Sequence, residues 1–174
     1  MSSATLMFLV IRAVHVLLAA LWVGSTAFMV FFVMPALKET GPAAAPMMGA
    51  IARKGLNAFM AALGGIAVLT GFYLYWRFTG GFDPELSATH GAMVFGTGGI
   101  AGLISVIIGG AVVGRNMKRM GDSGAKAMAL PEGPERTRLM GESNAARDRG
   151  VAGARIVLVL QMIAVICMAI GHYV

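Results

Sequence analysis

Long apolar runs alternate with short polar connections along this chain. The first run, residues 13 to 34, contains one ionisable side chain, His15. At about 1.5 Å per residue, a helix of this length crosses a bilayer core of about 30 Å. Three further apolar runs follow, so the pattern predicts four membrane spans, at about residues 6–34, 55–78, 84–113 and 151–173. We therefore predict an all-α integral membrane four-helix bundle that forms a single transmembrane domain over residues 1–174.

Composition and charge favour a membrane protein over a soluble or nucleic-acid-binding one. Hydrophobic residues make up 57% of the sequence and charged residues only 13%, which is far too apolar for a soluble domain. The net charge of +6 lies in the connections beside the apolar runs, so a lipid bilayer accounts for it better than nucleic acid does. The single cysteine, Cys167, excludes a disulfide within the chain.

The lysine and arginine count predicts the orientation. Connections 36–54 and 114–150 carry three and eight such residues, whereas the opposite side has only Arg12 and Arg77. Because cytoplasmic connections are enriched in positive charge, both termini should lie on the outer, periplasmic side of the inner (plasma) membrane. All three histidines, His15, His90 and His172, then fall toward the outer face.

Polar groups gather on one face of the first span. Steps of three and four residues along a helix keep Arg12, His15, Trp22 and Thr26 on the same side. An ionisable residue inside a span is costly and is therefore a functional candidate. Neutral imidazole is a common ligand of metals and haem iron, and His15 and His90 are expected at similar depths. We predict that they bind one haem b, since the chain has no Cys-x-x-Cys-His motif for covalent attachment.

Further residues complete the predicted cofactor site. Arg12 and Arg77 are expected to meet the haem propionates, and Trp22 lies on the face of His15. Gly71 belongs to a heptad series with Asn57 and Gly64 that would leave room for a flat ring. His172 and Met168, on the last span, are alternative ligands.

Two other functions remain open at this point. The fourteen methionines allow a copper-binding or copper-transport protein that uses His15, His90 and some thioethers, although they are scattered along the chain. Histidines inside spans can also simply pack between helices of a membrane scaffold. A Soret band in the purified protein would support haem binding, and bound copper in a colourless protein would support the copper function. The absence of both would support the scaffold.

The first two spans resemble a known family. His15, the Leu-Trp-Val-Gly sequence at residues 21–24 and the Pro-Ala-Leu sequence at residues 35–37 are similar to the first helix of CopD/HemJ-like small integral membrane proteins. The Leu-Thr-Gly-Phe-Tyr-Leu sequence at residues 69–74 resembles their second helix. The resemblance implies a bundle of four or more helices with His15 as a ligand. HemJ-like members bind haem b and act as protoporphyrinogen oxidases, while CopD-like members are linked to copper uptake.

One departure from that family bears on function. HemJ-like proteins place a lysine in the third span, whereas residues 91–113 carry no charge here and His90 stands at the start of that span. We accordingly predict electron transfer or redox chemistry near the outer face, with a quinone or a periplasmic protein as redox partner. A haem-pathway (porphyrinogen) oxidase is a second alternative. The sequence leaves open whether the protein is an enzyme and whether it forms a homo-oligomer.

Overall fold

The computed structural model describes residues 2–41 and 44–174, and this part of the chain consists of helices and short connections without a strand. The helices are α1 (Ser3–Phe28), α2 (Met34–Thr40), α3 (Ala44–Arg53), α4 (Leu56–Phe78), α5 (Pro84–Ser87), α6 (His90–Ile108), α7 (Arg115–Met128) and α8 (Pro134–Ile170). Two π-helical segments, η1 (Met29–Val33) and η3 (Gly109–Gly114), join α1 to α2 and α6 to α7. Four continuous helical rods in the described residues are long and apolar enough to span a membrane. The predicted all-α membrane bundle is therefore confirmed.

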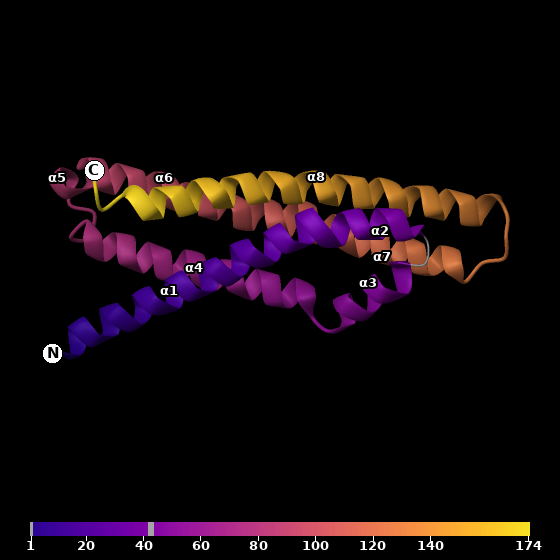
Figure 1. Ribbon diagram of the computed structural model, residues 1–174, viewed down its shortest axis with the longest axis horizontal. Helices are drawn as coiled ribbons and strands as arrows, with labels where there is room; N and C mark the ends of the chain where they lie inside the picture. Colours follow the sequence, from indigo (N-terminus) through magenta and orange to yellow (C-terminus); the bar gives the residue numbers. More distant parts are fainter. Residues whose placement is uncertain (1, 42–43) are drawn as a thin grey trace.

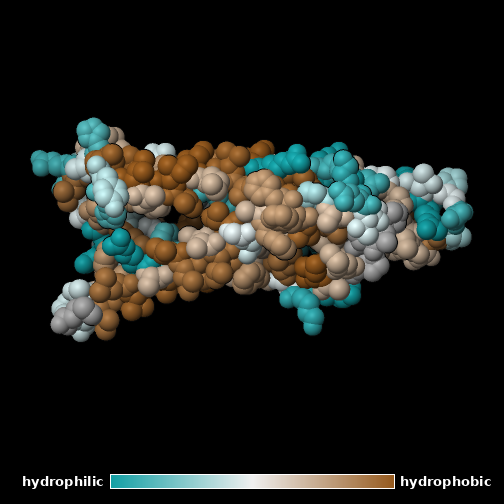
Figure 2. Space-filling view, in the orientation of Figure 1, coloured by the Kyte–Doolittle hydropathy of each residue, from teal (hydrophilic) through white to brown (hydrophobic). Residues whose placement is uncertain are grey.

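The rods are arranged as two antiparallel pairs. α1 crosses α4 obliquely, and the rod of α6, η3 and α7 runs beside the long straight helix α8 (Figure 1). Both chain termini lie at one end of the bundle, while the α7–α8 connection lies at the other. Hydrophobic surface covers most of the half toward the termini, apart from hydrophilic groups at its tip, and hydrophilic surface gathers over α7 and the first part of α8 (Figure 2). The charged connection after α6 is thus a helical hairpin that extends the bundle beyond its apolar part.

Pro35 does not end the first helix, although we expected the first span to stop there. Proline has no N–H to donate to the carbonyl four residues back, and its ring crowds that carbonyl. The π-helical segment η1 absorbs this defect, since the N–H of Met34 donates to the carbonyl of Met29. Pro35 then stands in the first turn of α2, where a missing N–H costs little.

The third span begins at His90 instead of Pro84. Asp83 caps the helix that Pro84 opens, as its sequence indicates, because its carboxylate accepts the N–H groups of Glu85 and Leu86. That helix, α5, ends after one turn. A second cap then starts α6, where the Thr89 hydroxyl accepts the N–H of Ala92. His90 is therefore the first residue of its helix and lies less deep than the sequence suggested.

Candidate functional site

His15 is held between α1 and α4 by its Nδ1 atom. This nitrogen lies 2.9 Å from the carbonyl oxygen of Ala67 and 3.2 Å from the Thr70 hydroxyl. A carbonyl can only accept, so Nδ1 carries the hydrogen and Nε2 carries the lone pair in the neutral ring. Nε2 makes no hydrogen bond within the described part of the chain. Thr70, which the pattern of the sequence does not single out, thus helps to orient the imidazole.

Gly71 faces His15, and the imidazole occupies the space that the missing side chain of the glycine leaves. A Cβ atom at Gly71 would lie 2.8 Å from Cε1 of His15. One heptad away, a Cβ atom at Gly64 would lie 2.9 Å from two ring atoms of Trp22. The two glycines of α4 therefore accept the imidazole and the indole of α1, and Trp22 is a buried packing residue.

His90 and His15 are not brought together. Gly91, next to His90, lies against Phe78 of α4, where a Cβ atom on the glycine would be 3.8 Å from the phenylalanine ring. His15 instead contacts the stretch of α4 from Ala67 to Gly71. These positions are seven to eleven residues apart, which is about 10–17 Å along a helix axis. The side chain of His90 is exposed, so this arrangement does not place both imidazoles on one iron.

The alternative ligands on the last span are engaged in packing. The ring centroid of His172 lies 4.9 Å from that of Phe95 and 6.3 Å from that of Phe78, both in edge-on geometry. Met168 faces α6, since its Cε atom would lie 3.1 Å from a Cβ atom at Gly98. Both side chains therefore face α6, whereas His15 lies at the contact of α1 with α4.

The two predicted propionate partners are both exposed. Arg12 lies one turn before His15 on α1, and Arg77 stands in the last turn of α4, toward the end of the bundle where the termini lie. Figure 2 shows the surface hollowed between α1 and α8 at this end. Cationic side chains therefore lie on two of the helices at the end where the bundle opens.

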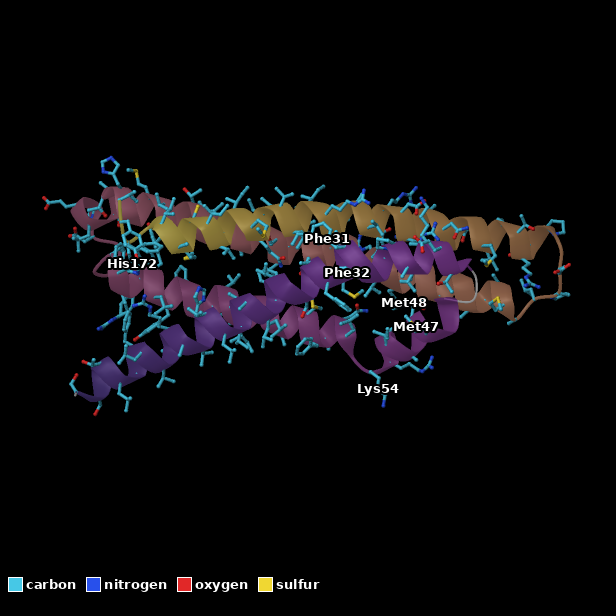
Figure 3. The ribbon with its side chains drawn as sticks, in the orientation of Figure 1. Phe31, Phe32, Met47, Met48, Lys54 and His172 are labelled. Atoms are coloured by element: carbon cyan, nitrogen blue, oxygen red, sulfur yellow. The ribbon has the colours of Figure 1, made fainter. Side chains whose placement is uncertain are left out.

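A cluster of thioethers forms at the opposite end. The buried residues Met34 and Leu37 are packed by Met29, Met48 and Met117, which come from η1, α3 and α7. Met47 and Phe32 line one groove, and Figure 3 shows both, together with Met48, far from His172. No sequence spacing could reveal this cluster, because its members come from four separate segments that only the fold brings together.

Among the described residues, the side chains that most often bind metals, His, Cys, Asp and Glu, do not form a cluster like that of the methionines. Within residues 2–41 and 44–174, no three His, Cys, Asp or Glu side chains are close enough to share a metal ion. His15 and the methionine group are therefore the two candidate ligand sites that the described residues offer. No protein-family model, no curated protein and no solved structure matches this chain.

Proposed function

We propose that this multi-pass membrane protein binds haem b through Nε2 of His15 and serves in electron transfer or related redox chemistry. The observation that carries this proposal is the hydrogen bond from Nδ1 of His15 to the Ala67 carbonyl. Histidines that ligate metals usually donate their other ring N–H to a carbonyl or carboxylate, which fixes the tautomer and the ring orientation. The unpartnered Nε2 is then the atom available to iron.

The residues present would supply one histidine ligand to the haem iron. His15 is oriented for ligation, whereas His90 is at a different depth, so we propose His15 as the only histidine ligand. Bound haem would supply one-electron chemistry at its iron. The chain's share is to ligate, to exclude water with the apolar faces of four helices, and to place Arg12 and Arg77 near ionised propionates.

The direction of the charge asymmetry supports a location in the plasma membrane with this site toward the outer face. Its redox partner would then be a membrane-soluble quinone or a periplasmic protein. The hollow between α1 and α8 is the side from which such a partner could approach.

An absorption spectrum of the purified full chain tests this proposal. We expect a Soret band in the wild type and its loss in His15→Ala. His90→Ala and His172→Ala serve as matched controls and should keep the band, because both imidazoles lie outside the contact of α1 with α4. A colourless wild-type protein after expression with added haem precursor would overturn the proposal, as would a His15→Ala variant with an unchanged spectrum.

The methionine cluster supports a second candidate function, the binding of Cu(I). Thioethers are soft ligands that suit Cu(I), and the packing of Met34 brings thioethers from η1, α2, α3 and α7 to one place. A groove of about 310 Å³ adjoins the cluster, since Val33 and Leu37 belong to both. Phe28, Phe32 and Met47 are among its other lining residues. Copper handling would therefore use the end of the bundle opposite His15.

Methionine-to-leucine variants separate ligation from packing, because leucine nearly conserves the volume. We expect Met48→Leu combined with Met117→Leu to weaken Cu(I) binding at least tenfold in competition with a chromophoric chelator. Met7→Leu and Met162→Leu, at exposed positions on α1 and α8, are the controls. Equal affinity in all variants would assign the cluster to packing alone.

A further inference from the structure

Gln161 is the only glutamine of the chain, and it lies in the apolar C-terminal part of α8 with 1% of its surface exposed. Neither its Oε1 nor its Nε2 atom has a hydrogen-bond partner among the described residues. Buried polar side chains are nearly always hydrogen-bonded, and ordered water supplies the partner where protein does not. Inside an apolar bundle this requirement is strict, because an unpaired amide there is costly.

A second buried polar group lies at the same contact between α6 and α8. Ser105 is fully buried, and its hydroxyl donates to the carbonyl of Ala101 at 2.9 Å. The same oxygen lies 3.5 Å from the carbonyl of Val157, which is one turn before Gln161 on α8. Helical side chains lean toward the N-terminus of their helix, so Gln161 leans over the turn that Ser105 touches.

Small residues of α6 face this part of α8. Gly98 lies against Ala164 and Cys167, one to two turns after Gln161, while Ser105 lies against Val157, one turn before it. The α6 residues between these two contacts include Ala101 and Gly102. Neither can reach across to the amide of Gln161 with a polar side chain, so the partner must come from elsewhere.

We propose that a water molecule is bound between Gln161 and Ser105 in the interior of the bundle. The water accepts a hydrogen bond from Nε2 of Gln161 and donates one hydrogen to Oε1 of the same amide. Its second hydrogen goes to the Ser105 hydroxyl oxygen, whose own hydrogen is used on Ala101. Three hydrogen bonds are the usual number for a buried water.

The water site lies close in depth to His15. Val106, next to Ser105, would touch a Cβ atom at Gly64 of α4, whereas His15 contacts α4 from Ala67 to Gly71. The difference of three to seven residues corresponds to about 5–10 Å along the axis. The bundle thus holds a hydrated polar site near the level of the half-buried imidazole of His15, independently of whether a cofactor binds there.

Because the chain has a single glutamine, labelling glutamine side-chain amides with ¹⁵N gives one nitrogen resonance, which belongs to Gln161. In the full chain in detergent micelles or nanodiscs, we expect the two amide protons to show cross-peaks to a long-lived water. Ser105→Ala should weaken these cross-peaks at least twofold, since it removes one of the three hydrogen bonds. Thr97→Ala, at an exposed position on the same helix, should leave them unchanged.

Two results would overturn the proposal. Absence of water cross-peaks in the folded wild type would show that the amide is dry, and this measurement needs no variant. Cross-peaks that are equally strong in Ser105→Ala and in the wild type would place the water elsewhere. A crystal structure of the wild type offers a second measurement, with density expected at about 2.7–3.2 Å from both Gln161 and Ser105.

Discussion

His15 of α1 lies against Gly71 of α4, where a Cβ atom on the glycine would come within 2.8 Å of the imidazole. The hydrogen bond from Nδ1 of His15 to the carbonyl of Ala67 depends on this close approach. One heptad along the same helix, Gly64 accepts Trp22 in the same manner. The pairing of two ring side chains with two glycines therefore sets the contact between α1 and α4.

This contact predicts different effects for neighbouring glycines. Gly64→Ala would place a Cβ atom 2.9 Å from Trp22 and 3.1 Å from Val106, so we expect a loss of about 1–3 kcal/mol in unfolding free energy. Gly65→Ala meets nothing within 4 Å and should be neutral or stabilising by about 0.5–1 kcal/mol, because alanine favours the helix. Thermal or denaturant unfolding in detergent measures both. Equal stabilities of the two variants would contradict the packing described.

Gly71→Ala should act on His15 itself. The added methyl group must displace the imidazole, so the hydrogen bond to Ala67 is expected to lengthen or break. We expect the NMR signals of the His15 ring to shift in this variant and any haem bound through it to be lost more readily. Gly99→Ala, where nothing lies within 4 Å, is the control and should leave the ring signals in place.

The proposed haem site predicts unequal roles for two exposed arginines. Arg12 lies one turn from His15, whereas Arg155 lies in α8 just after the charged hairpin, toward the opposite end of the apolar part. Arg12→Ala should weaken haem retention or shift its reduction potential, because a cation near ionised propionates is lost. Arg155→Ala should do neither. Equal effects on retention and potential would remove Arg12 from the proposed site.

The orientation of the bundle is open to a direct test. The structure places both termini at one end, and the charge asymmetry predicts that this end faces outward. A reporter that is active only in the cytoplasm, fused after Val174, should therefore be silent. The same reporter inserted in the α7–α8 connection, near Glu132, should be active. The reverse pattern would turn His15 toward the inner face.

Asn116 stabilises the end of the π-helical segment η3 through its side chain. Its side-chain amide donates to the carbonyl of Val112 at 2.8 Å and is largely buried. Asn116→Leu should leave this carbonyl without its side-chain donor and cost about 1–3 kcal/mol of unfolding free energy. Asn57→Leu, at an exposed position, is the matched substitution and should change stability much less. Similar losses in both variants would show that the bond contributes nothing specific.

The sequence by itself determined the fold class, the number of spans and the placement of both termini at one end. Four apolar runs of spanning length are enough for these, because every backbone polar group in a bilayer must be paired within a helix. It also selected His15, since an ionisable group inside a span stands out against its apolar surroundings.

Only the tertiary structure decided which groups meet. A one-turn helix and a second cap delayed the third span, so His90 lies far from His15 although their sequence positions suggested equal depth. The seven-residue spacing of Gly64 and Gly71 predicted that another helix or a flat ligand approaches α4 closely. Only the packing showed that these glycines receive Trp22 and His15. The methionine cluster around Met34 and the unpartnered Gln161 depend on how four helices are rotated about their axes. That rotation arises from contacts between distant segments, which local sequence patterns do not encode.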